Sequence, residues 1–248
     1  VVEMRDSGTP RAWWERNIAA RVDGPSKTEK LVPSTPIGCK RLCVDTHYYE
    51  IYNQAHVSLV DLNETPITRI EGNAILTGTI RCEVDAIVLA TGFDAMTGAV
   101  MNIDIRGKNG LSLQDKWATG PKAYLGLATA GFPNLFLVTG PGSPSVLSNM
   151  LPSIEQHVEW IASCIEFMDR HQHRSIDPDR DAEEAWIEHV NEVADTSVYP
   201  GCNSWYLGAN VEGKSRVFMP YLGVPPYVEK CNEVVAAGYA GFKLSGTS

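Results

Sequence analysis

The sequence has no apolar run that approaches the roughly 18 residues needed to cross a bilayer, and its start has neither the basic nor the apolar segment of a secretory signal. It is also short of positive charge, because 21 Lys and Arg stand against 30 Asp and Glu, for a net charge of −9. Binding to nucleic acid or to an anionic membrane needs a basic surface. We therefore expect neither as a main partner.

Several motifs of catalytic chemistry are missing as well. There is no G-x-S-x-G nucleophile elbow and no H-E-x-x-H metal pair. The six cysteines occur in a chain without a secretory signal, so we expect reduced thiols in a cytoplasmic protein. Cys39, Cys43 and His47 lie close together, but no second Cys/His pair completes a set of four zinc ligands, and we expect no metal site.

What is present is typical of a globular chain, with 44% hydrophobic and 21% charged residues among 248. Apolar periodicity predicts a helix over 11–22, followed by a connector, and a second helix with its buried stripe at 154, 158, 161, 165 and 168. Asp177 and Pro178 predict the start of a third helix that runs to about Asp195, and a fourth begins near Pro226.

Strand patterns are fewer. Residues 57–62 are short and apolar, 67–76 form a hairpin pattern around Gly72-Asn73, and 84–92 and 134–138 are apolar runs typical of strands buried on both faces. The class is therefore α/β. Two buried strands and one hairpin are too few for a complete doubly wound sheet, so the sequence predicts part of a larger fold.

The segment VTGPGSPSVLSNM (138–150) passes from an apolar run into a predicted helix through two glycines and two prolines. It is close to the dinucleotide motif G-x-G-x-x-G, but the third position is Ser145 and the prolines remove N–H donors. A phosphate loop and a tight strand-to-helix turn with a serine cap both remain open, with the turn favoured.

Three other features have both a functional and a structural interpretation. Lys40 and Arg41 are adjacent cations that suit a phosphate or a developing anion, or that are ordinary surface charge. Trp205 lies in a glycine-punctuated loop and suits either ligand stacking or core packing. His157 and His189 lie within helical patterns, where a hydrogen-bonded structural histidine is favoured.

Four stretches resemble one family in order and with few gaps, over residues 12–245. They are GCKRLCVDTHYYEIYN, VDAIVLATGFDAMTGA, YLGLATAGFPNLFLVTGPGSPSVLSNMLPSIEQHVEWI and SWYLGANVEGKSRVFMPYLG. Together they resemble the C-terminal half of type I Baeyer–Villiger monooxygenases, especially the flavoproteins that act on phenylacetone and steroids. The family uses FAD, NADPH and O₂ to insert oxygen beside a ketone carbonyl, giving an ester or lactone.

The resemblance implies a partial flavoprotein fold with two dinucleotide-binding, Rossmann-like domains. Residues 1–37 would end a helical insertion, 38–89 would be the C-terminal part of the NADP-binding domain, and 90–248 that of the FAD-binding domain. The family's two G-x-G-x-x-G loops and its F-x-G-x-x-x-H-x-x-x-W motif are absent from this sequence. The resemblance therefore implies a fragment or one subunit, inactive without an N-terminal half or partner chain that carries those motifs.

The resemblance also assigns site residues. Arg41 matches the catalytic arginine, a cation that stabilises negative charge during oxygen transfer, and it lies at the NADP site with Lys40 and Trp205. Asp94 would set domain geometry. The other matches lie in one turn: Gly140, Ser145 and Met150 at FAD, and Ser145, Val146, Leu147 and Met150 at the ketone pocket.

Two other functions stay open. One is a related flavin monooxygenase that oxygenates nitrogen or sulfur, and the other is a non-catalytic subunit of a split flavoprotein. The GPGSPSVLSNM segment and the Lys40-Arg41 pair favour the ketone-oxidising reading over the first.

Overall fold

The computed structural model describes residues 8–246, although the side chains of residues 8–10 and Ser145 are outside what it describes. Within that range the chain divides into two compact units. The first contains residues 38–41 and 93–246, and the second contains residues 8–37 and 42–92. No helix within 8–246 combines the length and the apolar character needed to cross a membrane.

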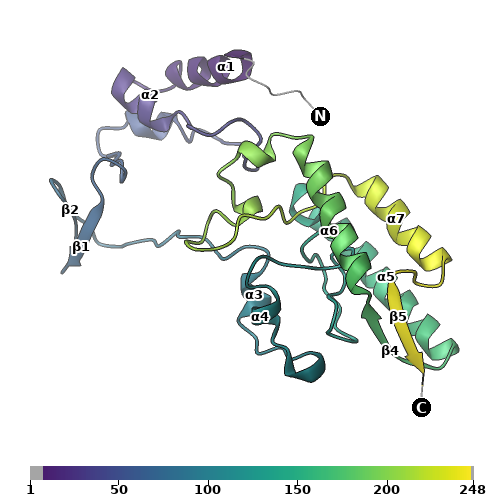
Figure 1. Cartoon of the computed structure of the whole chain (residues 1–248). Coiled ribbons are helices and arrows are strands. Elements are labelled where there is room, and N and C mark those ends of the chain that lie inside the picture. Colours follow the sequence, from purple (N-terminus) through teal and green to yellow (C-terminus); the bar gives the residue numbers. More distant parts are fainter. Residues whose placement is uncertain (1–7, 247–248) are drawn as a thin grey trace. The chain divides into compact units, whose positions relative to one another are not determined.

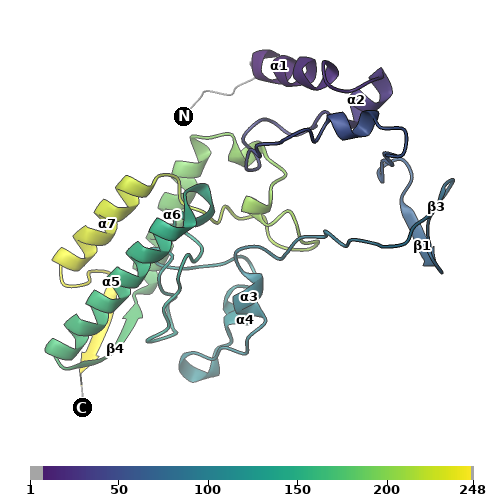
Figure 2. The same cartoon turned by 180° about the vertical axis from the view of Figure 1, so that it is seen from behind.

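Three helices and a two-stranded sheet form the main body of the first unit (Figure 1). They are α5 (Met150–Arg170), β4 (His173–Pro178), α6 (Arg180–Asp195), α7 (Val224–Ala236) and β5 (Phe242–Gly246). The view from behind shows α5 running beside α7 (Figure 2), and Trp160 of α5, Trp186 of α6 and Tyr227 of α7 share one buried core. Burial of such aromatic side chains is the main source of this unit's stability.

Helix α5 is where the sequence predicts it, but its buried face is different. Asn149 caps the helix by accepting a hydrogen bond from the Leu151 N–H. The buried positions are Ser153, His157, Trp160, Cys164 and Met168. The predicted stripe is confirmed at Met168 and at Ile161, which packs against the core, and Ile154 is half-buried. It is wrong at Val158 and Ile165, which are 50% and 49% exposed.

Helix α6 also exists as predicted, but it begins later. Its N-cap is Asp179, whose side chain accepts from the Asp181 N–H. Asp177 is not the cap because its carboxylate accepts hydrogen bonds from the Gly131 N–H and the Lys108 ammonium. Pro178 is the last residue of β4, which pairs antiparallel with β5, and the sequence pattern predicted neither strand.

Short elements complete this unit. They are α3 (Gly98–Met101), α4 (Leu113–Lys116), and the 3₁₀ helices η2 (Lys108–Gly110), η3 (Ser145–Leu147), η4 (Tyr199–Gly201) and η5 (Trp205–Leu207). One buried ion pair holds α4 to α6, because Lys116 Nζ lies 2.7 Å from Glu183 Oε2. The other oxygen of Glu183 accepts from Thr129 Oγ1 and from the Ala130 N–H.

The second unit contains two helices and a small sheet. Helix α1 (Gly8–Ala19) confirms the first predicted helix, with Ile18 buried. Helix α2 (Pro25–Leu31) lies within the predicted connector, and its proline at N1 starts the helix rather than preventing it. The 3₁₀ helix η1 covers Glu50–Asn53.

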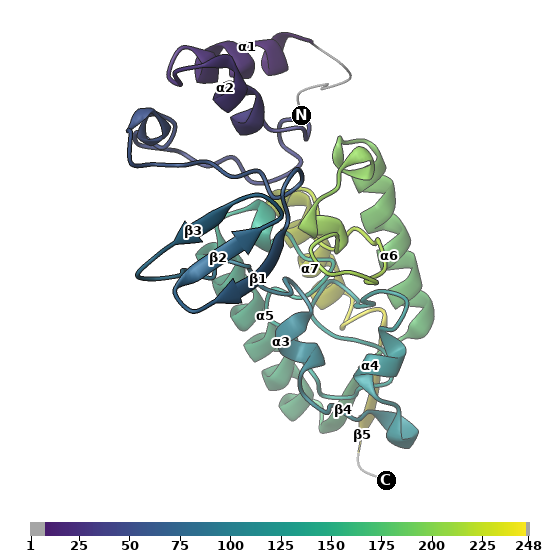
Figure 3. The same cartoon turned by 90° about the vertical axis from the view of Figure 1, so that its left-hand side faces the viewer.

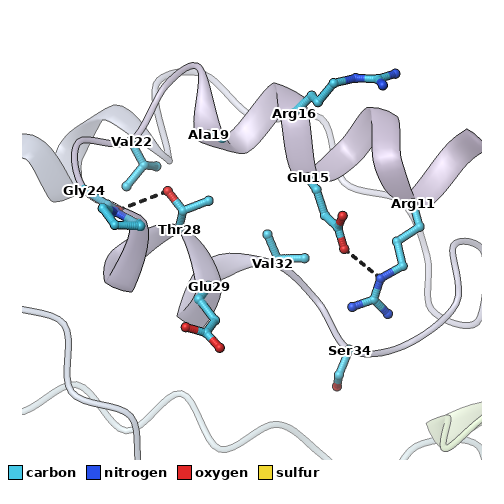
Figure 4. A pocket seen from close by; sticks show the side chains of 11 residues that line it. Arg11, Glu15, Arg16, Ala19, Val22, Gly24, Thr28, Glu29, Val32 and Ser34 are labelled. Carbon is cyan, nitrogen blue, oxygen red and sulfur yellow. Dashed lines mark hydrogen bonds and ion pairs between the residues drawn. The ribbon is translucent and has the colours of Figure 1, made fainter. Parts of the chain in front are cut away.

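The predicted hairpin of this unit is confirmed. Strand β1 (Ile67–Glu71) pairs antiparallel with β2 (Ala74–Thr77) through a turn in which Gly72 has φ +60°, and β3 (Arg81–Glu83) extends the sheet (Figure 3). A hollow of about 790 Å³ lies along α1 and α2 (Figure 4). None of the predicted site residues lines it.

Three predicted strands are wrong. Residues 57–62 and 84–92 form no strand, and 134–138 make only an isolated bridge through Phe136. The 84–92 segment is not buried either, because Val88 and Leu89 are 88% and 77% exposed. A strand needs the hydrogen bonds of a neighbouring strand, and within residues 8–246 no strand of either sheet pairs with these segments.

Candidate active site

The turn that follows residue 138 uses its glycines for packing within the chain. A Cβ at Gly140 would lie 2.5 Å from the Gly126 carbonyl oxygen, and a Cβ at Gly142 would lie 2.9 Å from Trp186 Nε1. Gly142 also has φ +89°, and its carbonyl accepts a hydrogen bond from the same indole N–H. Close internal contacts therefore explain both glycines, as a tight turn would require.

The remaining residues of this turn lead into α5 in two steps. Ser145, Val146 and Leu147 form η3, and α5 begins only at Met150. The predicted serine cap is therefore wrong for this helix, whose N-cap is Asn149, and the Ser145 side chain lies outside the described part. Val146, Leu147 and Met150 are half-buried, and the first two pack against the core of the three long helices.

A buried histidine braces the start of the turn. His157 Nδ1 accepts a hydrogen bond of 2.8 Å from the N–H of Thr139, a residue with φ +55°. With Nδ1 accepting, Nε2 carries the proton and donates to the Tyr227 hydroxyl at 3.0 Å, which in turn donates to the Leu125 carbonyl at 2.8 Å. Leu125 has φ +56°, so one chain of hydrogen bonds holds two strained backbone positions.

Because His157 is buried and neutral, we expect the free energy of unfolding to fall in mild acid. Burial lowers the pKa of His157 to about 4. In the unfolded state the pKa of this histidine is near 6.5, so the unfolded chain binds the proton first as the pH falls. The contribution of neutral His157 to the free energy of unfolding is therefore complete above about pH 6.5 and is lost as the pH falls toward 4. We expect the free energy of unfolding to fall by about 2 kcal/mol between pH 7 and pH 5 from this group.

Urea unfolding, followed by tryptophan fluorescence at pH 7 and at pH 5, measures this change in the free energy of unfolding. His157→Gln is the matched variant. Carboxylates titrate alike in both proteins, so they cancel in the comparison. Equal pH dependence of the two proteins would contradict the assignment.

A short extended segment joins this turn to the Trp205 region. The Gly142 N–H donates to the Met219 carbonyl, and the Tyr221 N–H donates to the Ser143 carbonyl. On its other side, the Met219 N–H donates to the Tyr206 carbonyl at 3.1 Å. The turn that carries the predicted FAD and ketone residues is thus joined through this segment to Tyr206, the neighbour of the predicted NADP residue Trp205.

Trp205 begins η5, where Ser204 caps the turn by accepting from the Tyr206 N–H. Its ring is half-buried and lies 4.3 Å from the ring of Tyr206, which is only 2% exposed. Farther along this loop, which spans residues 201–221 and is called the Trp205 loop below, Lys214 forms an ion pair with Asp94. Asp94 therefore anchors the Trp205 loop within this unit, while its expected effect on domain geometry stays a prediction.

The Lys40-Arg41 pair reaches the same unit through a disulfide. Cys39 is bonded to Cys202, with the two Cα atoms 5.5 Å apart, so the expectation of reduced thiols is wrong for these two residues. The bond also removes Cys39 from any set of metal ligands. Lys40 and Arg41 are exposed. Burial raises the pKa of Tyr206, and the charge of Arg41 acts on it in the opposite direction.

Every predicted site residue thus lies within the first unit. The sequence analysis did not predict three features that join these segments. They are the Cys39–Cys202 bond, the hydrogen bonds of the extended segment around Met219, and the hydrogen bond of Tyr227 to His157. No local pattern signals the first, because 163 residues separate the two cysteines.

Comparison with known proteins identifies the relationship. No family model matches the chain. Cyclopentanone 1,2-monooxygenase of Comamonas sp. (strain NCIMB 9872) is 40% identical over 94% of the chain and 43% of its own length. Phenazine N-monooxygenase PhzNO1 of Lysobacter antibioticus is 41% identical over 90% of the chain and 41% of its own length. A Baeyer–Villiger monooxygenase of Pseudooceanicola batsensis is 38% identical over 88% and 40%. The chain therefore spans rather less than half the length of these relatives.

Solved structures agree with this relationship. An oxidised steroid monooxygenase bound to NADP is 45% identical, with a TM-score of 0.89 over 97% of this chain and 46% of its own. A complex of OTEMO with FAD and NADP is 36% identical, with a TM-score of 0.90 over 96% of this chain and 44% of its own. The α/β class is confirmed, and so is the resemblance: over nearly its whole length the chain is related in sequence and fold to the C-terminal part of the Baeyer–Villiger monooxygenases.

Proposed function

We propose that this chain supplies the C-terminal half of an FAD- and NADPH-dependent Baeyer–Villiger monooxygenase, which inserts one oxygen atom of O₂ beside a ketone carbonyl. One observation carries the proposal. The segments bearing Arg41 and Trp205 are bonded together, and both lie in the unit that contains the turn at Gly140–Met150. We retain the domain boundaries 1–37, 38–89 and 90–248 as part of this proposal.

The residues suit NADP. Lys40 and Arg41 present two exposed cations of the kind that bind phosphate, and the half-buried Trp205 presents an aromatic face to a nucleotide. The steroid monooxygenase, which contains bound NADP, is 45% identical to this chain. Lys40 and Trp205 would bind and orient the nucleotide.

The residues suit FAD only in part. Gly140 and Gly142 approach other parts of this chain, so they offer no free phosphate cradle. Val146, Leu147 and Met150 are half-buried side chains at the outer end of the turn, and they would form an apolar wall for a planar ring and a small ketone. The remaining contacts to FAD would come from an N-terminal half.

Arg41 would carry the electrostatic part of the reaction. Bound FAD supplies the activation of O₂, while the protein positions the substrate, excludes water and stabilises charge. A guanidinium stabilises an oxyanion through its fixed charge and planar donors, without acting as an acid. Removing such a donor affects the rate more than substrate binding.

Two uncovered apolar surfaces support the need for an N-terminal half. In the second unit, Val88 and Leu89 are largely exposed, and on α5 Leu151, Val158 and Ile165 are 68%, 50% and 49% exposed. Leu151, Val158 and Ile165 recur every seven residues and so share one face of α5, and an apolar helix face is usually covered by another part of the protein. An N-terminal half with the G-x-G-x-x-G loops would cover it and complete both nucleotide sites.

A second candidate rests on the similarity to the phenazine N-monooxygenase, which is as high as that to the cyclopentanone enzyme. The same cofactors would then oxygenate an aromatic nitrogen. The two functions differ in product, because a ketone yields an ester or lactone and a phenazine yields an N-oxide.

The experiment joins the chain to the N-terminal half of the steroid monooxygenase, as a fusion, and supplies NADPH with cyclopentanone, phenylacetone or a phenazine. We expect an ester or lactone, identified by mass spectrometry, and no N-oxide. A fusion that binds FAD but forms only the N-oxide would establish the second candidate. One that folds yet binds no flavin would support a non-catalytic subunit.

A further inference from the structure

We propose that Cys39 and Cys202 form a redox-sensitive disulfide that positions the Lys40-Arg41 segment against the Trp205 loop. The bond itself does not depend on the function proposed above, whereas its catalytic consequence does. The arrangement deepens that function by making its site responsive to thiol redox conditions.

The geometry favours bond formation. The two Cα atoms are 5.5 Å apart, which is within the range in which a disulfide closes without backbone movement. Cys39 is fully buried, while Cys202 is half-buried and accessible from solvent. An accessible thiol next to a buried partner suits stepwise oxidation and reduction.

The position of the bond distinguishes it from an ordinary structural crosslink. Cys39 directly precedes Lys40 and Arg41, and Cys202 lies three residues before Trp205. Residues 38–41 belong to the first unit, although the chain on both sides of them belongs to the second. The disulfide is thus a covalent attachment for a short segment that carries the proposed catalytic arginine.

The rest of the Trp205 loop has its own noncovalent anchors. Asn210 donates to the Phe93 carbonyl, Lys214 pairs with Asp94, and Met219 bonds to Tyr206. Reduction would therefore release the start of the loop and the arginine segment, while the far end of the loop stays in place. The expected change is local.

Two other cysteines of this unit are poor redox centres. Burial raises the pKa of Cys164 to about 12 and that of Cys231 to about 11, so both remain protonated thiols of low reactivity. A disulfide in a cytoplasmic protein is usually transient or regulatory. In a reducing compartment, Cys39–Cys202 would be such a bond.

The chemistry balances with a small-molecule disulfide such as oxidised glutathione. The Cys202 thiolate attacks one sulfur, forms a mixed disulfide and releases one reduced glutathione. Cys39 then attacks Cys202 Sγ and releases the second. The protein loses two thiol protons and two electrons, and one disulfide becomes two thiols. Excess glutathione reverses both steps.

Peptide mapping without reductant tests the bond on this chain alone. The protein is equilibrated with oxidised glutathione, free thiols are alkylated, and trypsin is added. We expect the peptides 31–40 and 181–214 to be joined, and to separate when the disulfide is reduced before alkylation. Quantitative alkylation of both cysteines after oxidation would overturn the proposal.

Hydrogen exchange tests the positioning role independently of activity. Reduction is expected to speed amide exchange severalfold in residues 38–41 and 201–208, and to leave 214–221 unchanged. Cys39→Ser should show the fast exchange with or without reductant, whereas Cys82→Ser, in strand β3, should behave as the unmodified protein. Unchanged exchange on reduction would refute the positioning role even where the bond is found.

The fusion enzyme then adds the catalytic readout. Reduction and Cys39→Ser should each raise the KM for NADPH severalfold and, because the released segment carries Arg41, lower kcat as well. The two treatments should have effects of the same size. Unchanged kinetics on reduction of a mapped disulfide would overturn the catalytic consequence. A fusion inactive under all conditions would count against the proposed function, while the mapping and exchange results still decide the disulfide.

Discussion

Replacing Arg41 with alanine is expected to lower kcat of the reconstituted enzyme by about 10²–10³-fold, the usual effect of removing one donor that stabilises an oxyanion. The side chain is exposed at the start of the first unit, close enough to Tyr206 for its charge to act on the phenol. Arg41→Lys keeps the charge but loses the planar fork, so it should recover only part of the rate. Product formation from a ketone measures both variants.

Two controls separate this effect from a general loss of positive charge. Lys40→Ala should mainly raise the KM for NADPH, because Lys40 is proposed to bind phosphate. Arg106, which is exposed and paired with Asp104 in the same unit, should tolerate alanine with unchanged kinetics. A kcat for Arg41→Ala within a few-fold of the unsubstituted enzyme would contradict the catalytic assignment.

The largest expected effect on stability comes from Glu183→Ala. Glu183 is 1% exposed and pairs with Lys116, which is 11% exposed in its side chain. Its removal leaves the ammonium with the Ala130 carbonyl as its acceptor among the described residues, and leaves Thr129 Oγ1 and the Ala130 N–H without the carboxylate. Breaking a buried ion pair from one side costs about 3–5 kcal/mol.

Urea unfolding of the chain measures this cost, and the next residue provides the matched control. Glu184 is exposed on the same helix, so Glu184→Ala should change the free energy of unfolding by less than about 0.5 kcal/mol. Combining Glu183→Leu with Lys116→Met should recover much of the loss, because no uncompensated charge remains. Equal effects at 183 and 184 would show that the pair contributes little.

The helices were predictable because capping and periodicity are local signals. Asn149 and Asp179 illustrate the remaining error, since each caps a helix one or more residues away from the expected start. The buried face of α5 was predicted wrongly for another reason. Val158 and Ile165 are apolar but exposed. Their helical spacing predicts an apolar face of α5, but residues 8–246 do not cover that face at these two positions.

Strands were predicted poorly because pairing is not local. The apolar run at 84–92 indicates burial in a sheet, yet residues 8–246 provide it with no neighbouring strand. The opposite error occurs at β4, whose partner β5 lies near the end of the chain and whose sequence ends in Pro178. A proline there gives no strand signal.

For the site, the motif residues could be read from the sequence, but the contacts that join them could not. Lys40, Arg41 and Trp205 stand in recognisable stretches. The hydrogen bonds of His157 and the pairing of Cys39 with Cys202 depend on the folded chain, because each joins segments far apart in sequence.

The most direct test of the account is flavin binding by the chain with and without an N-terminal half. After incubation with FAD and dialysis to remove the unbound flavin, the chain alone should be colourless. The fusion with the steroid monooxygenase half should retain the visible absorbance of bound flavin. It should oxidise NADPH only when a ketone is converted. Stoichiometric flavin in the chain alone, or ester formation by it, would contradict the proposal that its nucleotide sites are completed by an N-terminal half.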